Sequence, residues 1–459
     1  MIVASDWAGK RYAVLGLARS GAATVSALLA GGAKVVAWDS DPAKRSALAP
    51  LPLRGGVGGG ASPQNATLGE PPHPNPSPEG EGLTLIDLDT MDLSGFDALV
   101  VSPGVPLNTH PLAAAARAAG VPVIGDIELF AQARRNLPPH KVVGITGTNG
   151  KSTTTALVHH ILKTAGVPTL MGGNIGLPIL GQDPLPEGGV YVLELSSYQI
   201  DLTQSLDCDV AVLLNITPDH LDRYDGFEGY AASKARLFAM QSAGHVAIVG
   251  TEDEASANIA QGLAGRIDDL VTIAASVIDQ SRWPALQGPH NAQNAQAAIA
   301  VARALGLGED AIEAGLRTYA SLPHRMQHVA TRGGVAFVND SKATNPESTA
   351  PALAAFLRVH WIVGGKRKSN DLDACAVHLN HVVAAYTIGE AAPLFFDLLR
   401  DKVPVVEQSG TLEAAVAHAA AAAQPGDTVL LSPACASFDQ FRDYEARGDA
   451  FRAAVEALA

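Results

Sequence analysis

The chain has 459 residues, which is enough for roughly two to four domains that each bury a hydrophobic core. Hydrophobic residues make up 47% of the sequence and charged residues 17%, and no apolar run reaches the ~18 residues of a membrane span, so we expect no such span. The formal net charge of −14, without a long basic block, argues against a nucleic-acid partner.

The amino-terminal segment and the cysteines indicate a cytoplasmic protein. The first residues, MIVASDWAGKRY, lack a basic region followed by a long apolar stretch, so no secretory signal peptide is expected. The three cysteines, Cys208, Cys375 and Cys435, cannot all pair, and none stands in a CxxC motif. Reduced thiols in the cytosol fit this pattern best.

Short apolar, β-branched runs alternate with Ala/Leu-rich helical patterns along the whole chain. This rhythm predicts an α/β fold with mostly parallel sheets. After Lys151, for example, the apolar residues of 157–162 fall on one helical face, and Gly166 ends the run. The expected strands are Tyr12–Leu17, Lys34–Trp38, Ala98–Ser102, Val121–Ile124, Lys141–Thr146, Val190–Leu195, Val210–Asn215, His245–Val249, Val335–Asn339, Trp361–Val363 and Thr428–Ser432.

One segment breaks this rhythm. Residues 50–82 contain eight Pro and eight Gly, and such a composition buries too little apolar surface to offset the entropy of ordering. We expect a disordered surface insertion there, with a binding role as the alternative. Domain boundaries are expected near residues 128–139 and 321–324. The predicted domains are therefore 1–129, 130–321 and 322–459.

A glycine-rich loop, GITGTNGKSTTT, stands between an expected strand and an amphipathic helix. Gly147 and Gly150 let the backbone approach a phosphate closely. The N-terminus of the helix adds free N–H groups and the positive end of its dipole. Lys151 can reach the β and γ phosphates of a nucleotide, and the Ser152 hydroxyl can bind Mg²⁺. The loop therefore predicts an ATP site.

This loop has the short form GTNGKST. Ile145 stands where the strict GxxxxGK[ST] pattern has a glycine, so a glycine-rich turn with a chance lysine is the alternative. The flanking strand and helix favour the phosphate loop. The predicted ATP contacts in the loop are Gly147, Thr148, Asn149, Gly150, Lys151, Ser152 and Thr153.

With this loop and the motifs described below, the sequence resembles the Mur ligase family over nearly its whole length, residues 50–82 excepted. The resemblance implies a Rossmann-like UDP-binding domain, a central P-loop ATPase-type α/β domain and a Rossmann-like carboxy-terminal domain. It also implies a reaction in which a substrate carboxylate and ATP form an acyl phosphate, which an amine then attacks.

The family pattern implies a metal site for Mg²⁺, with two ions expected. Glu194 in VLELSSYQ ends a strand near the loop, and a carboxylate there is a natural ligand for Mg²⁺, although a surface glutamate is the alternative. His220 in NITPDHLDRY resembles the family's metal-ligand histidine, although a lone histidine is more often structural. Lys234 in YAASKARLF resembles the lysine that the family carries as a carbamate, although by itself it is only a helical lysine. The implied ligands are Ser152, Glu194, His220 and Lys234 as its carbamate, and the implied catalytic residues are Lys151, His220 and Lys234.

The resemblance also assigns the remaining ATP contacts. Asn291 and Asn294 in GPHNAQNAQAA stand three apart at a helix start, so both can face one ligand, with a helix cap as the alternative for Asn291. They match the family's adenine-side asparagines. Arg325 in LPHRMQ and Asp340 in NDSKATNP match residues that contact ATP from the third domain, where an arginine can offset charge on the transferred phosphoryl group.

The third domain is expected to hold an amino acid. Lys342 and Thr344 follow a strand in NDSKATNP, and VGGKRKSND supplies Lys366 and Lys368. We favour Lys368 as the partner of a side-chain carboxylate, and a solvated basic turn is the alternative. The motif LLSPACASFDQF is typical of the family member that adds D-glutamate, and no DNPR motif of the diaminopimelate-adding type occurs in the chain. The implied D-glutamate contacts are Lys342, Thr344, Lys368, Ser437, Phe438 and Tyr444.

The first domain carries GLARSG after a strand, which weakly resembles a nucleotide-binding turn, and SPGVP follows another strand. An acidic residue at the next strand end often meets a ribose or base. A dehydrogenase-type NAD site is the alternative for GLARSG alone. The family pattern implies that the UDP-substrate contacts are Ser20, Asp39, Ser40, Gly104 and, from the second domain, Asn174.

Taken together, the resemblance implies a cytoplasmic, monomeric enzyme that joins D-glutamate to UDP-N-acetylmuramoyl-L-alanine with ATP, in peptidoglycan precursor synthesis. The nearest alternatives are folylpolyglutamate synthetase and a relative that adds L-glutamate. The alternative from another class is a non-catalytic nucleotide-binding module, but Lys151, Glu194, His220 and Lys234 together favour catalysis.

Overall fold

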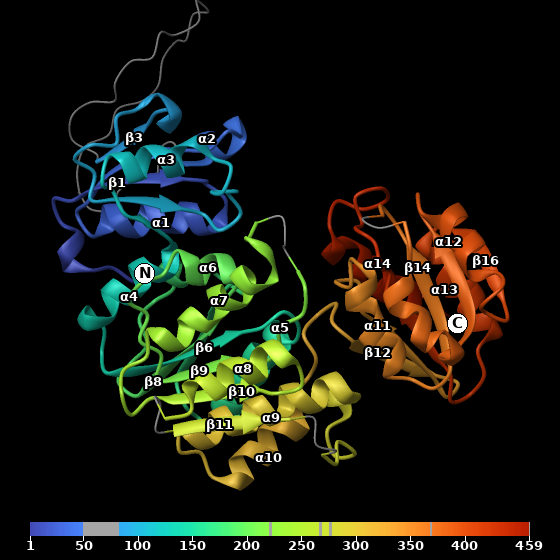
Figure 1. Ribbon diagram of the computed structural model, residues 1–459. Helices are drawn as coiled ribbons and strands as arrows, with labels where there is room; N and C mark the ends of the chain where they lie inside the picture. Colours follow the sequence, from blue (N-terminus) through green and yellow to red (C-terminus); the bar gives the residue numbers. More distant parts are fainter. Residues whose placement is uncertain (49–81, 220–222, 266–268, 275–277, 368–369, 459) are drawn as a thin grey trace, which may run out of the picture.

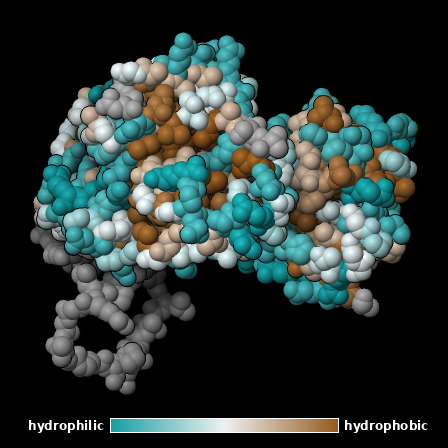
Figure 2. All heavy atoms as spheres, turned by 90° about the horizontal axis from the view of Figure 1, so that it is seen from below, coloured by the Kyte–Doolittle hydropathy of each residue, from teal (hydrophilic) through white to brown (hydrophobic). Residues whose placement is uncertain are grey.

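The computed structural model describes residues 1–48, 82–219, 223–265, 269–274, 278–367 and 370–458. The expected insertion at 50–82, except Gly82, and the expected site residues His220 and Lys368 lie outside these ranges. Three β-sheets follow one another along the chain, each covered by helices (Figure 1). The space-filling view shows the region of the third sheet as a separate lobe beside the other two (Figure 2).

The first sheet is parallel, with strand order β3-β2-β1-β4-β5. The chain passes from β1 through β2 to β3 on one side and then crosses to β4 on the other side of β1. The carboxyl ends of β2, β1 and β4 therefore meet at one edge, where such sheets bind ligands. The strands are β1 Arg11–Leu15, β2 Lys34–Trp38, β3 Leu83–Leu85, β4 Ala98–Val101 and β5 Val123–Ile124; the helices are η1 Ser5–Trp7, α1 Arg19–Ala30, α2 Pro42–Leu48, η2 Leu88–Thr90, α3 Pro111–Ala118, α4 Asp126–Ala133 and η3 Arg134–Asn136.

The second sheet is also parallel, with order β11-β10-β9-β6-β8-β7. Its central strand β6 leads into the phosphate loop, and β9 and β8 flank it. The strands are β6 His140–Thr146, β7 Thr169–Gly173, β8 Gly189–Glu194, β9 Val210–Leu213, β10 Val246–Gly250 and β11 Asp269–Ile273; the helices are α5 Lys151–Thr164, η4 Ile179–Gly181, α6 Ser197–Asp201, α7 Gly226–Ala239, α8 Glu254–Leu263, η5 Pro284–Leu286, α9 Pro289–Ala304 and α10 Glu309–Thr318.

The third sheet has order β12-β13-β17-β14-β15-β16, and only its edge strand β12 pairs antiparallel among the described strands. The strands are β12 Gln327–Arg332, β13 Val335–Asn339, β14 Val359–Gly364, β15 Val382–Ile388, β16 Val406–Gly410 and β17 Thr428–Leu431; the helices are α11 Pro346–Ala354, η6 Asp373–His381, α12 Ala392–Leu399, α13 Leu412–Ala422 and α14 Tyr444–Glu456.

The α/β fold with mostly parallel sheets is confirmed, and each of the expected strands is present with ends shifted by a few residues or less. Six further strands, β3, β7, β11, β12, β15 and β16, were not expected. All of these except β15 are edge strands. Edge strands are short or half exposed, as β12 and β16 are, so their sequences lack a continuous apolar run.

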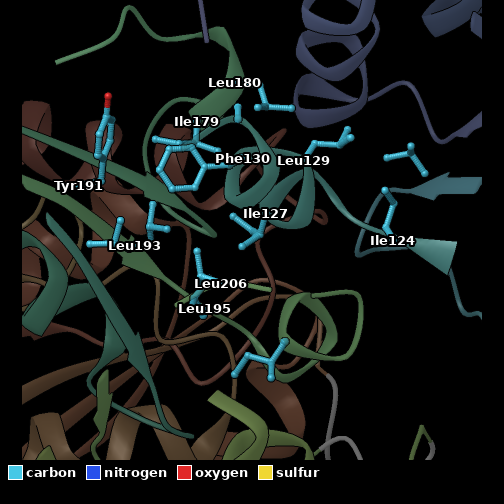
Figure 3. Close-up of a cluster of buried hydrophobic side chains, with 14 of the residues drawn as sticks. Ile124, Ile127, Leu129, Phe130, Ile179, Leu180, Tyr191, Leu193, Leu195 and Leu206 are labelled. Atoms are coloured by element: carbon cyan, nitrogen blue, oxygen red, sulfur yellow. The ribbon is translucent and has the colours of Figure 1, made fainter. Parts of the chain in front are cut away.

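The first expected domain boundary, near residues 128–139, begins inside α4. This helix packs on both neighbouring sheets. Ile127 and Phe130 are fully buried, and they point toward side chains of β8 such as Tyr191 and Leu193 (Figure 3). The rings of Phe130 and Tyr191 meet edge to face with centroids 5.1 Å apart. One hydrophobic cluster therefore continues from the first sheet into the second.

Glu128 on α4 ties this junction with hydrogen bonds. Its buried carboxylate accepts from the backbone N–H groups of Gln204 and Ser205, at 2.7 and 2.9 Å, and from the Ser205 hydroxyl at 2.7 Å. These donors lie in the loop between α6 and β9. The carboxylate thus satisfies polar groups that the packing of α4 removes from water.

Within the part of the chain that the structure describes, no helix combines the length and the apolar character that crossing a membrane requires.

We expect Glu128→Ala to lower the stability of the chain by about 2–4 kcal/mol, because two backbone amides and one hydroxyl lose a charged acceptor. The measurement is the apparent Tm in scanning calorimetry. Glu187→Ala, which removes an exposed carboxylate of the same region, is the matched control and should leave the Tm unchanged. An equal Tm for both variants would contradict the junction role of Glu128.

Candidate active site

The phosphate loop connects β6 to α5 and requires glycine at two positions. Gly147 and Gly150 have φ angles of +151° and +83°, a region that L side chains rarely adopt. A Cβ at Gly150 would also stand 2.3 Å from the Asn294 Oδ1 atom. The two glycines therefore allow the loop to lie directly beneath α9 and to begin α5 with its N–H groups free of side-chain caps.

The Lys151 side chain folds back over this loop. Its Nζ donates to the Gly147 and Thr148 carbonyl oxygens, each at 2.8 Å. Burial lowers the pKa of Lys151, the nearby Glu194 carboxylate opposes this shift and the Arg325 guanidinium adds to it. The loop thus holds a cation at the point where the sequence predicts the terminal phosphates of ATP.

Lys234 on α7 reaches the same loop from the other side. Its Nζ donates to the Gly147 carbonyl oxygen at 3.0 Å and lies 4.6 Å from the centre of the Tyr230 ring. The side chain is only 1% exposed. Burial, followed by repulsion from Lys151, lowers the pKa of Lys234 well below its ordinary value.

Glu194, at the carboxyl end of β8, has one free carboxylate oxygen. The Asn174 amide donates to Oε1 at 3.0 Å, while Oε2 is buried without a hydrogen-bond partner. An unpartnered buried carboxylate oxygen beside a phosphate loop has the donor chemistry that Mg²⁺ prefers. Among the described residues no three His, Cys, Asp or Glu side chains form a ligand set, so a metal here needs other ligands as well.

Arg325, just before the third sheet, contacts the start of α5 beside this loop, and Asp340 orders the residue that follows Arg325. An Arg325 Nη2 donates to the Ser152 hydroxyl at 2.9 Å, and its Nε is buried without a partner. The Asp340 carboxylate accepts from the Met326 N–H at 3.1 Å and from the Ser432 hydroxyl at 2.8 Å. Burial raises the pKa of Asp340 to about 7.

An open pocket lies between the phosphate loop, α9 and the segment that leads into the third sheet. Asn294 on α9 accepts a hydrogen bond from the Thr154 hydroxyl at 3.1 Å and donates to Asn291 at 3.1 Å. The Asn291 amide in turn donates to the Gln287 carbonyl oxygen. The lining includes these predicted ATP contacts: Asn149, Gly150, Thr153, Asn291, Asn294, Arg325 and Asp340.

The predicted amino-acid residues gather at the carboxyl ends of the third sheet. The Lys342 ammonium lies 5.1 Å from the centre of the Tyr444 ring, and burial lowers the pKa of this lysine to about 8. Thr344 follows on the same loop, and Ser437 is buried after β17. Phe438, in contrast, is 68% exposed and does not pack in this group.

Arg447 on α14 joins the two loops that carry these residues. Its guanidinium donates to the Ser341 carbonyl oxygen at 2.8 Å, to the Ser341 hydroxyl at 3.0 Å and to the Cys435 carbonyl oxygen at 3.0 Å. Ala436 also pairs with Lys366 in both directions at 2.9 Å. The sequence reading missed Arg447 because a helical arginine carries no local sign of burial.

The predicted UDP contacts lie at the carboxyl edge of the first sheet, with one exception. The Asp39 carboxylate accepts from the Leu17 N–H at 2.7 Å, which orders the GLARSG turn that contains Ser20, and Ser40 follows directly. The Gly104 carbonyl oxygen accepts from Arg223 of the second region at 3.3 Å. The exception is Asn174, which lies in the second region and binds Glu194.

Asn215 and Gln293 also line the ATP-side pocket, and the sequence reading missed them. Both stand inside motifs that it quoted, NITPDH and GPHNAQNAQ. The position of Asn215 just after the apolar strand β9 is a signal that could have identified it, because strand ends carry ligands in parallel sheets. Gln293 gave no such signal, since its spacing from Asn291 places it on another helical face.

Two family models match the chain. Residues 145–283 match the Mur ligase middle domain, and residues 324–435 match the Mur ligase glutamate ligase domain. The chain is 60% identical to the UDP-N-acetylmuramoylalanine–D-glutamate ligase of Novosphingobium aromaticivorans, with 100% of this chain and 97% of that protein covered. It is also 60% identical to the ligase of the same name from Sphingopyxis alaskensis, with 100% of both covered.

Solved structures share the fold at low identity. UDP-N-acetylmuramate–alanine ligase MurC from Thermotoga maritima aligns with a TM-score of 0.56 at 15% identity, covering 98% of this chain and 99% of that one. MurF ligase from Thermotoga maritima in complex with ADP aligns with a TM-score of 0.56 at 16% identity, covering 99% and 97%. With the full-length relatives at high identity, these matches lead to one conclusion: the chain belongs to the Mur ligase family.

Proposed function

We propose that the chain is an ATP-dependent ligase that joins D-glutamate to UDP-N-acetylmuramoyl-L-alanine in cytoplasmic peptidoglycan precursor synthesis. The observation that carries the proposal is the meeting of Lys151, Lys234 and Glu194 at the phosphate loop. The names of the full-length relatives supply the substrates. Because the residues proposed to bind the UDP substrate, ATP and D-glutamate all belong to one chain, a monomer suffices.

The reaction needs two bond exchanges. A carboxylate oxygen of the L-alanyl group attacks the γ-phosphorus of ATP in line, the bond to the departing ADP oxygen breaks, and an acyl phosphate results. The amine of D-glutamate then attacks the acyl carbon, loses a proton, and inorganic phosphate leaves. Lys151 and Arg325 offset charge on the transferred phosphoryl group, and catalysis is otherwise positioning.

The residue roles in this proposal are those that the family resemblance implies. ATP occupies the pocket beside α9, with its phosphates at residues 147–153 and its base near Asn291 and Asn294. Lys342, Lys368, Ser437 and Tyr444 hold D-glutamate, and Thr344 and Phe438 line its approach. The UDP group binds at the carboxyl edge of the first sheet, by Ser20, Asp39, Ser40 and Gly104, and Asn174 meets the sugar nucleotide. The domains are 1–129, 130–321 and 322–459.

Magnesium would be held by Ser152, Glu194, His220 and a carbamate on Lys234, with two ions in all. Mg²⁺ neutralises phosphate charge when it is bound. The unpartnered oxygen of Glu194 supports this ligand set.

The carbamate on Lys234 is supported by the burial and the lowered pKa of its amine. The ammonium first loses one proton, and the neutral amine then attacks CO₂. A C–N bond forms and a second proton is released, so a buried cation is replaced by an anion. This change removes the repulsion between Lys234 and Lys151.

We expect phosphate release from Mg·ATP only when both UDP-N-acetylmuramoyl-L-alanine and D-glutamate are present. The assay compares D-glutamate, L-glutamate and no amino acid. Release with L-glutamate instead would keep the ligase mechanism and overturn the amino-acid assignment. No release with any of them would favour one of the two alternatives, a ligase with a folate-type substrate or a non-catalytic nucleotide-binding module.

We expect Lys151→Ala to lower kcat about 100-fold or more, since it removes a cation that faces the developing phosphoryl charge. Lys163→Ala, an exposed lysine on the same helix, is the control and should keep full activity. Steady-state kinetics with saturating substrates decides, and comparable kcat values for the two variants would remove Lys151 from the mechanism.

We expect Lys234→Ala to be nearly inactive, with partial rescue by added short-chain carboxylate that replaces the carbamate. In the enzyme that keeps Lys234, lowering the pH should reduce the fraction carrying the carbamate, because protonation converts the amine into an ammonium that cannot attack CO₂. Depletion and return of bicarbonate at constant pH checks this. Full activity of the alanine variant without any additive would contradict the carbamate.

A further inference from the structure

Asn215, in the segment after β9, forms hydrogen bonds with the phosphate loop. The Thr148 N–H donates to the Asn215 carbonyl oxygen at 2.9 Å, and the Asn149 N–H donates to the Asn215 Oδ1 at 2.9 Å. The Asn215 Nδ2 donates back to the Asn149 carbonyl oxygen at 3.3 Å. Asn215 thus pairs with two successive peptides of the loop. These N–H groups anchor the loop, so the donors left for phosphate come from the residues that begin α5.

Gln293 on α9 determines which way the Asn215 amide faces. The Asn215 Nδ2 also donates to the Gln293 Oε1 at 2.9 Å. The Gln293 Nε2 donates to the Leu214 carbonyl oxygen at 3.1 Å and to the Glu252 carboxylate at 3.3 Å. Both of these partners are pure acceptors, so they hold the Gln293 oxygen toward Asn215. An Asn215 amide turned by half a rotation would present an N–H to the N–H of Asn149.

The backbone leaves room for this relay. A Cβ at Gly250, the last residue of β10, would stand 2.0 Å from the Leu214 carbonyl oxygen and 3.0 Å from the Gln293 Nε2. The relay is also enclosed, since Gln293 is only 5% exposed. Hydrogen bonds in such a setting are costly to leave unmade.

We propose that Gln293 is a positioning residue that holds the phosphate loop in its nucleotide-binding conformation through Asn215. The same helix carries Asn291 and Asn294, so α9 links the base end of the pocket to its phosphate end. The inference rests on the proposed use of ATP and adds a residue that acts on the phosphates without touching them.

The test is binding of Mg·AMPPNP and of adenosine to the full chain by titration calorimetry. We expect Gln293→Leu, which keeps the approximate volume and removes the relay, to weaken AMPPNP about 10-fold and to leave adenosine within about 2-fold. Gln241→Leu is the matched control. Gln241 also donates to two backbone carbonyls of the second region, of Cys208 and Val246, but lies outside the pocket lining, so its loss should change neither affinity.

A second substitution covers the case in which Gln293→Leu does not fold. Glu252→Ala removes one exposed anchor of Gln293 and should weaken AMPPNP about 2- to 3-fold. In a cycle with Asn215→Ala, the effects of Gln293→Leu should be less than additive, because both act through one set of bonds.

The outcomes separate the two proposals. If the chain without substitutions did not bind AMPPNP, the proposed function itself would be overturned. Unchanged AMPPNP affinity in Gln293→Leu would overturn the relay. An equal loss for adenosine and AMPPNP would also overturn it, since Gln293 would then contact the nucleoside directly.

Discussion

The backbone carbonyl of Gly147 accepts hydrogen bonds from the side-chain nitrogens of two buried lysines, Lys151 and Lys234, and the rest of the candidate site is arranged around them. Burial disfavours the charged form of both Lys151 and Lys234, and the Glu194 carboxylate partly offsets this effect at Lys151. Without ligands such a centre is electrostatically costly, because the interior screens charge poorly. A bound triphosphate would supply negative charge beside these lysines. The electrostatic cost of burying the lysines therefore favours nucleotide binding.

The topology of the three sheets explains why the predicted site residues gather near the phosphate loop. In each sheet a predicted site residue lies at the carboxyl end of a strand: Asp39 in the first, Glu194 in the second and Asp340 in the third. The first two sheets share a continuous hydrophobic cluster through α4, so their relative position is set by packing. Arg325, just before the third sheet, reaches the start of α5 through its hydrogen bond to the Ser152 hydroxyl.

The amino-acid side depends on a different feature, the buried Arg447, which donates hydrogen bonds to backbone carbonyl oxygens and to a hydroxyl. Arg447 bonds to carbonyl and hydroxyl oxygens of Ser341 and Cys435, so its charge is spread over two loops that lie far apart in sequence. Burial lowers its pKa to about 10. Its positive field at the end of the third sheet favours an anionic ligand such as a dicarboxylic amino acid.

The sequence by itself determined the α/β layers, the phosphate loop and most of the strand ends that carry ligands, because periodicity and glycine-rich turns are local signals. It could also identify Lys151, since the residues around it in the chain define its role. Only the tertiary structure decided that Lys234, an ordinary helical lysine in the sequence, is buried against Gly147, and that Asn215 and Gln293 support the loop. These contacts join residues about 70 to 90 positions apart, and burial at such distances follows from packing, which no local pattern encodes.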